Sequence, residues 1–386
     1  MDGRDIKERS IILSDLRQRA LDLHKKYKGK LATSIKPPVN GADDLSLLYS
    51  PGVGEVSKEI AQNLESAKLY TGLSNTVAVI SDGSAVLGLG NIGPVAGLPV
   101  MEGKALLFKH FADIDSVPVV LDVHTADEIV ATCKAIAPSF GAINLEDIKA
   151  PLCFEVEERL KEDLDIPVFH DDQHGTAIVV LAGLINSMKV VGKELNSTKI
   201  TLVGAGAAGI AIAKIIKKYA SGAEIVLVDS KGIVSKDRQD LNKYKQGFAV
   251  TAKGNLQDAV KDSDIFIGVS KPGLLTAELI ATMNSSPVVF ALANPDPEVL
   301  PEAAKKAGVA VIATGRSDLP NQVNNALVFP GIFRGALDNG VSKITDGHKI
   351  KAAKVLAAVV ASPSADEIVP SIFTEGIVET ISKEIV

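Results

Sequence analysis

The sequence predicts an α/β protein of two domains with largely parallel sheets. The chain has 386 residues, whereas single hydrophobic cores seldom grow past about 250–300 residues. Short apolar runs alternate with helical stretches along almost the whole chain, which is typical of repeated βα units. A glycine-rich turn, GAGAAG, directly follows one of these runs and precedes a helical stretch. Together these observations favour a Rossmann-type domain joined to a second α/β domain.

Eight apolar runs are predicted to be strands. Several are rich in Val and Ile without alternation of polar and apolar residues, as expected of strands buried on both faces. In chain order they are residues 76–82, 117–123, 166–170, 199–206, 224–230, 264–270, 287–295 and 309–315.

The glycine-rich turn is a GxGxxG motif in the context that dinucleotide binding requires. Its six residues are Gly204, Ala205, Gly206, Ala207, Ala208 and Gly209. The first glycine allows a tight turn, the second lets the backbone approach a pyrophosphate, and the third lets helix and strand pack closely. The pyrophosphate is expected at the helix N-terminus, where free N–H groups favour an anion.

Asp229 closes the next predicted strand, 20 residues beyond Gly209. An acid at this distance usually accepts the ribose hydroxyls of NAD. Lys231 lies two residues further on and could instead meet the 2′-phosphate of NADP. The carboxylate would repel that phosphate, so NAD is the favoured cofactor.

The predicted domain boundary follows from these positions. Residues 1–170 are expected to form the substrate domain and residues 171–325 the dinucleotide-binding domain, with a cleft at residues 169–177. A helix ending near Met188 would lead from the cleft into the second domain. Residues 326–386 look helical, with prolines as breakers, and are predicted to pack back on the first domain.

Composition excludes several classes of function. The net charge is −6 and no basic stripe stands out, so neither nucleic acid nor an anionic membrane is expected as partner. The N-terminus is charged rather than apolar, and no apolar run reaches the ~20 residues that span a bilayer. The two cysteines, Cys133 and Cys153, lack CxxC spacing, which favours buried thiols in a reducing cytoplasm.

Acidic residues near the cleft suggest a metal site. Glu146 and Asp147 are adjacent in INLEDIKAP, and Asp171 and Asp172 directly follow a predicted strand in FHDDQHGTA. Carboxylates beyond the carboxyl ends of parallel strands face the ligand-binding crevice. Glu146, Asp147 and one of the two aspartates, preferably Asp172, would form an oxygen site of the kind that Mg²⁺ and Mn²⁺ prefer.

Less specific interpretations remain open for the same residues. Most adjacent Glu-Asp pairs lie on the solvated surface, and Asp171 or Asp172 could cap the following helix. His170 and His174 have the i, i+4 spacing of zinc ligands on a helix. However, His170 is predicted at a strand end and HExxH is absent, so zinc is disfavoured and the histidines are expected to support the turn.

Two further residues stand out in apolar surroundings. Tyr49 precedes a Ser-Pro-Gly turn in LLYSPGVG, and Lys104 enters an apolar helical run. Taken alone, Tyr49 could be a core aromatic residue and Lys104 a surface lysine whose stem lies along apolar groups.

Seven motifs together and in this order resemble those of the short, prokaryotic-type malic enzymes: YSPGV, SDGSAVLGLGNIGPVAGLPVMEGKALLFK, INLEDIKAP, VFHDDQHGTA, GAGAAG, ALANPDPE and NNALVFPGIFRGAL. The match covers about residues 14–375. No single motif is specific for this family, but the seven motifs together are. The resemblance implies NAD(P)-linked, divalent-metal-dependent oxidative decarboxylation of (S)-malate to pyruvate and CO₂. It also implies a stand-alone form without a phosphate-acetyltransferase-like domain, and a homodimer.

Residue by residue, the resemblance implies a role for each matched position. Tyr49 matches the general acid and Lys104 the general base, which also touches substrate. Glu146, Asp147 and Asp172 match the metal ligands, and the GAGAAG loop matches the dinucleotide site. Asn294 matches a residue that touches substrate and nicotinamide. Asn325 matches a further substrate ligand, with Asn324 as the adjacent candidate.

One position departs from the larger malic enzymes. These carry an arginine that grips a malate carboxylate, and the corresponding residue here is Ala85. The candidates to replace it are Lys104, Ser84 and the backbone N–H groups of residues 52–54.

The resemblance favours one mechanism, and two other functions remain as alternatives to it. In the favoured mechanism, Lys104, kept neutral by burial and a nearby cation, takes the C2 hydroxyl proton, and Tyr49 later protonates C3. The first alternative is a metal-independent dehydrogenase of a small hydroxy or amino acid, with Lys104 or His174 as base. The second is a non-catalytic NAD(P)-binding module, which would have no need of the tyrosine, the lysine and the three carboxylates.

Overall fold

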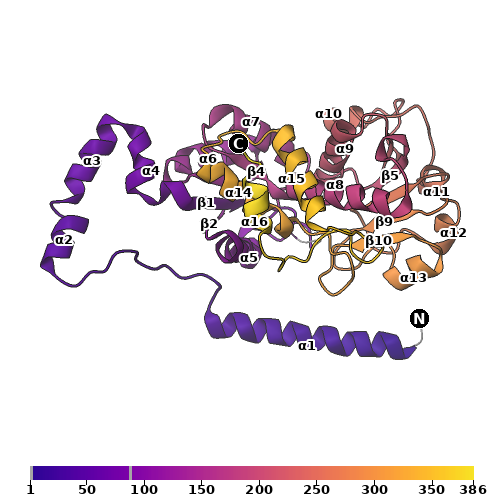
Figure 1. Ribbon diagram of the computed structural model, residues 1–386, viewed down its shortest axis with the longest axis horizontal. Helices are drawn as coiled ribbons and strands as arrows, with labels where there is room; N and C mark the ends of the chain where they lie inside the picture. Colours follow the sequence, from indigo (N-terminus) through magenta and orange to yellow (C-terminus); the bar gives the residue numbers. More distant parts are fainter. Residues whose placement is uncertain (1–2, 87–88) are drawn as a thin grey trace.

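The computed structural model describes residues 3–86 and 89–386, with side chains from residue 15 onward within these ranges. Two largely parallel sheets lie one after the other along the body of the molecule, and an N-terminal arm projects from it (Figure 1). Leu87 and Gly88, in the LGLG part of the second motif, lie outside the described residues.

The first sheet has four parallel strands in the order β2-β1-β3-β4. The strands are β1 (Thr76–Ser81), β2 (Asp115–Val120), β3 (Ala142–Leu145) and β4 (Val168–His170), and the connecting helices are α5 (Pro94–Ala112), α6 (Ala126–Ile136) and α7 (Leu152–Asp163). The inner strands are almost wholly buried, whereas the edge strand β2 is partly exposed. Because all four strands are parallel, their carboxyl ends lie along one edge of the sheet.

The second sheet has six strands in the order β10-β9-β8-β5-β6-β7, of which only β7 is antiparallel. The strands are β5 (Lys199–Val203), β6 (Glu224–Asp229), β7 (Gly232–Ile233), β8 (Ile265–Gly268), β9 (Val288–Ala291) and β10 (Val311–Thr314). The helices are α9 (Ala207–Tyr219), α10 (Lys243–Gln246), α11 (Leu256–Val260), α12 (Ala277–Ile280) and α13 (Pro301–Lys306). The strand order reverses between β5 and β8, and ligands of doubly wound sheets bind at such a switch point.

One long helix, α8 (Asp171–Val191), joins the two sheets. It is buried over most of its length and packs on α9 and on α15 (Asp346–Val359). It ends at Gly192, which is in the left-handed conformation, a common helix stop. By length and composition α8 could cross a membrane, but its packing is that of a core helix.

The C-terminal helices contact both halves of the body. α14 (Phe329–Asp338) packs on α5 of the first domain, and α16 (Ile377–Ser382) packs on α14 and α15. α15 packs on α8 and also on α9, which belongs to the second domain. The C-terminal segment thus contacts α5 of the first domain and also α9 of the second.

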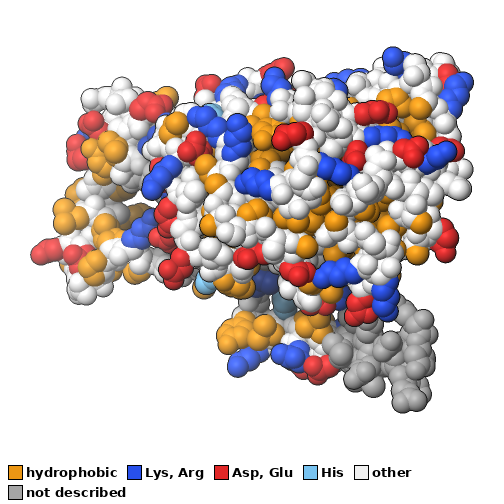
Figure 2. Space-filling model, turned by 45° about the vertical axis from the view of Figure 1, so that its right-hand side comes forward, with side chains coloured by type: hydrophobic (Ala, Val, Ile, Leu, Met, Phe, Trp, Pro, Cys, Tyr) orange, Lys and Arg blue, Asp and Glu red, His pale blue; other side chains and the backbone are white. Residues whose placement is uncertain are grey.

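The N-terminal arm contains α1 (Gly3–Tyr27), α2 (Ala42–Leu48), α3 (Val53–Gln62) and α4 (Ala67–Tyr70). α2 and α3 stand apart from the two sheets, whereas α1 runs below the body of the molecule in the view of Figure 1. The segment after α1 touches α5, where Lys30 N and Nζ donate to Glu102 Oε2 and Pro99 O at 3.1 and 2.9 Å. α2, α3 and α4 contain no buried residue, and hydrophobic side chains lie exposed on this arm (Figure 2).

All eight predicted strands are present, most of them shorter than expected at their carboxyl ends. β2 begins two residues earlier than predicted, at Asp115, and ends at Val120. Two strands were missed: β3, which has only four residues, and β7, which has two. Such short runs carry too little pattern to be recognised from sequence.

Candidate active site

Acidic residues follow two neighbouring strands of the first sheet. β3 is followed by Glu146 and Asp147, and β4 by Asp171 and Asp172, which open α8. Because β3 and β4 are parallel and in register, the two acidic pairs meet at one edge of the sheet. The turn after β3 is sharp, since Asp147 adopts a left-handed φ of 53°.

Three of these residues form a candidate metal site. Glu146, Asp147 and Asp172 each offer a carboxylate oxygen, and these oxygens lie within 4.8 Å of one another. Asp172 Oδ2 also accepts the backbone N–H of Asp147 at 2.8 Å, which holds the two turns together. Glu146 and Asp147 are buried, whereas the side chain of Asp172 is 32% exposed, so the group has one open side. Hard oxygen donors with an open side suit Mg²⁺ or Mn²⁺.

Lys104 on α5 lies directly beside this group. Its ammonium is 2.6 Å from Asp171 Oδ2 and 3.0 Å from Glu146 Oε1, and it lies 4.4 Å from the ring centre of Phe329. The side chain is only 7% exposed, so the surface-lysine interpretation is wrong. Burial lowers the pKa of Lys104, but the charges of Asp171 and Glu146 outweigh burial and raise the pKa above its ordinary value. Without a cation at the carboxylates, Lys104 is therefore an ammonium. The expectation that burial and a nearby cation together keep it neutral concerns the metal-bound site and stays a prediction.

Negative charge is in excess at this site. Four carboxylates, Glu146, Asp147, Asp171 and Asp172, face one ammonium. Burial raises the pKa of Asp171 to about 6 although Lys104 is its partner, and burial likewise raises the pKa of Asp172 to about 6. The pKa of Glu146 is also raised by burial. A divalent cation would relieve this excess, so the donor set fits one.

The histidines of FHDDQHGTA do not join the carboxylate group. His174 Nε2 lies 2.8 Å from Glu157 Oε2, and burial lowers the pKa of His174 to about 3. The ring of His170 is fully buried, and neither of its nitrogens has a hydrogen-bond partner among the described residues. His170 is the N-cap residue of α8 and makes no side-chain cap, so neither aspartate caps the helix as one alternative proposed. Zinc held by the two histidines has no support in this geometry.

Tyr49 does not reach this site within its own chain. It follows α2 on the N-terminal arm, which lies apart from α5 and α8 (Figure 1). Its side chain is 73% exposed, so the core-aromatic interpretation is wrong.

Ser84 and the backbone N–H groups, which could replace the arginine as ligands of a malate carboxylate, already have hydrogen-bond partners within the chain. Ser84 Oγ donates to Asp82 Oδ1 at 2.6 Å and accepts Lys149 N at 2.9 Å. Ala85 has only its backbone at the site, where Ala85 N donates to Asp147 O at 2.9 Å. Gly52 N and Gly54 N bond to carbonyls of the arm itself.

The glycine loop has the geometry of a dinucleotide site. Gly204 adopts a φ of 114°, and a Cβ there would lie 2.7 Å from Val269 O. A Cβ on Gly209 would lie 1.7 Å from Gly204 O, so the third glycine allows the helix to approach the loop. A Cβ on Gly206 would meet nothing within 4 Å, which leaves the loop open on the side of a ligand. Ala205 precedes this glycine, and Ala207 and Ala208 begin α9.

The asparagine candidates lie on the loops that follow β9 and β10. Asn294 packs against Gly315, where a Cβ would lie 3.0 Å from Asn294 Nδ2. Asn324 uses its side chain as a cap, since Oδ1 accepts Ala326 N at 2.8 Å. Asn325 contacts the first turn of α8, because its Cβ would be 2.9 Å from a Cβ on Gly175. Asn325 is therefore nearer to the carboxylates and is the better candidate for substrate.

Two buried acids were missed as organisers of the site. Glu157 on α7 accepts His170 N at 3.0 Å as well as contacting His174, so it fixes the start of α8. Glu298 is fully buried and accepts Ser270 N and Ala293 N at 3.0 and 3.1 Å, so it fixes the loop that carries Asn294. The Glu in ALANPDPE was the available sequence signal for the second.

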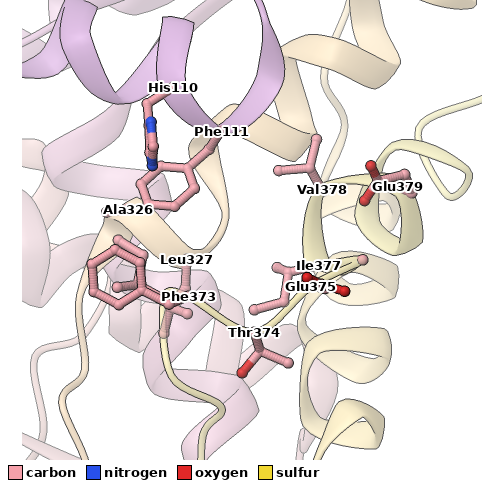
Figure 3. Close-up of a pocket in the computed structure, with 12 residues that line it drawn as sticks. His110, Phe111, Ala326, Leu327, Phe373, Thr374, Glu375, Ile377, Val378 and Glu379 are labelled. Atoms are coloured by element: carbon pink, nitrogen blue, oxygen red, sulfur yellow. The ribbon is translucent and has the colours of Figure 1, made fainter.

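A separate cavity of about 520 Å³ opens near Asn325 but is not a site for malate. Figure 3 shows a mixed lining, with apolar side chains such as Phe111, Leu327 and Phe373 and with Glu375 and Glu379 at one side. Its lining contains no lysine or arginine, and a dicarboxylate would be repelled by the two glutamates.

Comparisons with known protein families agree with this geometry. Residues 28–161 match the family model for the malic enzyme N-terminal domain, and residues 173–386 match the malic enzyme NAD-binding domain. Together these matches cover most of the chain.

Individual relatives span nearly the whole chain. A bifunctional malic/malolactic enzyme of Bacillus subtilis is 50% identical over 96% of this chain and 92% of its own length. An NADP-dependent malic enzyme of Halomonas elongata is 52% identical over 90% of this chain and 83% of its own length. The crystal structure of an NAD-dependent malic enzyme from Thermotoga maritima is 45% identical, with a TM-score of 0.91 over 95% of this chain and 98% of that one.

Proposed function

The chain belongs to the malic enzyme family and oxidises and decarboxylates malate to pyruvate and CO₂ with reduction of NAD(P)⁺; on that premise we propose which residues carry each step. The observation that carries the proposal is the carboxylate group of Glu146, Asp147 and Asp172 beside the buried ammonium of Lys104. A plain hydroxy-acid dehydrogenase has no use for such a group, whereas decarboxylation of a β-keto acid does.

We assign the metal to Glu146, Asp147 and Asp172, and Mg²⁺ or Mn²⁺ as its identity. When bound, the cation would supply a Lewis acid that stabilises negative charge on the substrate oxygens and would offset the carboxylates that hold the proton on Lys104. Asp171, which contacts Lys104 at 2.6 Å, orients the lysine.

Lys104 would act as the general base for the C2 hydroxyl of malate. Only its neutral form accepts a proton, so its own proton must leave Nζ before that step. Asp171 and Glu146 fix Nζ from two sides, and the Phe329 ring covers it. This leaves Nζ little freedom except towards the open side of the carboxylate group, where the hydroxyl of the substrate would lie.

The GAGAAG loop and the loops after β9 and β10 would hold the dinucleotide and substrate. The nicotinamide would accept the hydride from C2. Asn294 would touch nicotinamide and substrate, and Asn325, against the start of α8, a substrate carboxylate. We propose NAD as the preferred cofactor because Asp229 ends β6 beside the glycine loop, where Gly204 N donates to Val228 O at 2.9 Å.

One initial-rate series tests this function. Malate with Mn²⁺ or Mg²⁺ and NAD⁺ or NADP⁺ should give reduced cofactor and an equal amount of CO₂, and EDTA should abolish both. Full activity in EDTA, or reduced cofactor without CO₂, would instead support the metal-independent dehydrogenase. No reduction with either cofactor would remove the assignment altogether.

We further propose a homodimer in which Tyr49 of the partner subunit completes each site. The arm buries almost nothing in its own chain, which a stable monomer would not do with this many apolar groups. Its exposed large hydrophobic residues are Leu16, Leu21, Leu23, Tyr27, Leu31, Ile35, Val39, Leu45, Leu47, Leu48, Tyr49, Val53, Leu64, Leu69 and Tyr70.

Mixing two inactive variants tests where Tyr49 acts. Lys104→Ala and Tyr49→Phe subunits are unfolded, mixed and refolded together. If Tyr49 serves the other subunit, each mixed dimer has one site with both residues, and about a quarter of wild-type activity returns. If Tyr49 serves its own subunit, every site lacks one residue and no activity returns. A monomer by light scattering would also refute the proposal.

We also propose a cytoplasmic location, on the two buried and unpaired thiols Cys133 and Cys153. Cell fractionation with activity assays tests it, and activity confined to an extracellular fraction would refute it.

A further inference from the structure

Glu157, near the middle of α7, is a buried acid that takes no part in the proposed chemistry. Its side chain is 6% exposed, and it is not one of the three carboxylates that form the candidate metal site. A buried carboxylate is costly unless hydrogen-bond donors satisfy it. The donors around Glu157 therefore indicate which part of the structure it holds in place.

Four donors point at the carboxylate of Glu157. Oε1 accepts His170 N at 3.0 Å and Lys161 Nζ at 2.7 Å, and Oε2 accepts His174 Nε2 at 2.8 Å and Gln173 Nε2 at 3.4 Å. Lys161 lies one turn further along α7. The other three donors belong to residues 170–174, at the start of α8.

The three donors at the start of α8 lie on both sides of Asp171 and Asp172 in the chain. His170 is the N-cap residue and makes no side-chain cap. Glu157 instead accepts its backbone N–H from a different helix, and a negative charge is favourable at a helix N-terminus. Glu157 accordingly anchors the backbone and the side chains that flank the two aspartates.

The carboxylate of Asp172 has little else to fix it. Among the described residues it accepts one hydrogen bond, from Asp147 N at 2.8 Å, and its side chain is 32% exposed. Its place beside Glu146 and Asp147 therefore depends on the position of the first turn of α8. That turn is the part of the structure that Glu157 holds.

We propose that Glu157 is a positioning residue that sets the affinity of the metal site without touching the ion. By holding the first turn of α8 on both sides of the aspartates, it keeps Asp172 where its carboxylate can share an ion with Glu146 and Asp147. The inference rests on the proposed function only in taking these three carboxylates as the metal ligands.

Glu157→Gln tests this inference in the full chain. Glutamine keeps the size of the side chain but offers one oxygen, and its NH₂ group faces a donor whichever way the amide turns. The variant should bind Mn²⁺ about 10- to 100-fold more weakly than wild type, the range for partners that orient metal ligands. Electron paramagnetic resonance measures the free Mn²⁺ directly during a titration.

Steady-state rates give a second measurement. The Mn²⁺ concentration for half-maximal malate oxidation should rise by the same factor in Glu157→Gln. The kcat at saturating Mn²⁺ should stay within about threefold of wild type, because the bound ion selects the ordered turn. Glu157→Asp keeps the charge but shortens the side chain, so it should show a smaller loss of affinity. It also keeps the test available if Glu157→Gln does not fold.

Two control variants separate positioning from other roles. Glu158→Gln changes the next residue of α7, whose side chain is 48% exposed and pairs with Lys243. Asn186→Ala removes two buried hydrogen bonds near the other end of α8, to Ala357 O and Ile368 O at 2.8 and 3.0 Å, and should lower the unfolding temperature in EDTA. Both should leave the affinity for Mn²⁺ within about twofold of wild type.

Three results would overturn the inference. One is wild-type affinity for Mn²⁺ in Glu157→Gln. Another is an equal loss of affinity in Asn186→Ala, which would mean that any destabilisation weakens the site. The third is a lower kcat with unchanged affinity, which would mean a role in the chemical steps. Failure of the proposed function looks different, because wild type itself would then bind no Mn²⁺ or oxidise malate equally well in EDTA.

Discussion

Two charged clusters of this molecule carry opposite excess charge. At the carboxyl ends of β3 and β4, four carboxylates, three of them buried, face the ammonium of Lys104. At the end of β6, three cations face two carboxylates in a more exposed position, namely Lys231, Arg238 and Lys245 with Asp229 and Asp240. The negative excess of the first cluster fits a divalent cation, whereas the second cluster carries a positive excess. The stability costs differ as well, because burial makes the first imbalance far more expensive.

The largest expected effect comes from removing Lys104, the ammonium of the first cluster. Lys104→Ala should lower malate oxidation by about 10³-fold, within the range for loss of a general base, while dinucleotide binding persists. Lys109→Ala is the control, since Lys109 lies on the same helix but forms exposed pairs with Asp113 and Asp115. Initial rates and calorimetry with the dinucleotide measure both properties. Turnover near that of wild type in Lys104→Ala would exclude it as the base.

An effect of intermediate size tests the excess of carboxylates directly. Burial raises the pKa of Asp172 to about 6, so without a cation the ionised group destabilises the fold above that pH, and protonation relieves this as the pH falls towards 4. In EDTA at pH 8, Asp172→Asn should therefore unfold at a higher temperature than wild type, and the difference should vanish near pH 4.

With saturating Mn²⁺ the order should reverse. Wild type gains stability from the bound ion, by about 2.7 kcal/mol at 100 times its Kd, whereas Asp172→Asn loses a ligand and gains less. Thermal unfolding with and without Mn²⁺ measures this. A variant that is less stable than wild type in both conditions would show that Asp172 is needed for packing rather than for an ion.

The smallest expected effect is a change in cofactor choice when the charge of the second cluster is altered. Asp240→Asn removes one of its two carboxylates and raises the positive excess, so the ratio of kcat/KM with NADP⁺ to that with NAD⁺ should rise by about two- to fivefold, since the position is partly solvated. Asp366→Asn, in an exposed pair with Lys305, is the control. The gain should shrink at high salt, and a gain that salt does not affect would point away from charge.

The sequence could supply the parts of the site that depend on local pattern. The glycine loop, Asp229 and the acidic pairs each follow a strand directly, so a strand and its next residues are enough to locate them. The carboxylates could be expected to lie together because parallel strands end at one edge of a sheet, while their role as metal ligands stays a prediction. Asp172 rather than Asp171 as its third member is what the geometry also favours.

The pairings across the chain could not be read from sequence. Lys104 and Asp171 are 67 residues apart and meet only because α5 packs beside the edge where α8 begins. Lys245 reaches Asp229 from a four-residue helix, while the nearer Lys231 turns to Asp240. The exposure of Tyr49 depends on the path of the arm, which no local pattern determines.

The helix α8 has a mechanical consequence. Its first turn carries Asp172 into the carboxylate group, and its remaining length packs against α9, the helix that follows the glycine loop. α8 therefore transmits movement between the two halves. A rotation of the nucleotide half about the start of α8 would move Asp172 relative to Glu146 and Asp147. Closure of the cleft and tightening of the ion's coordination sphere would then be one motion, so nucleotide and ion would each strengthen the binding of the other.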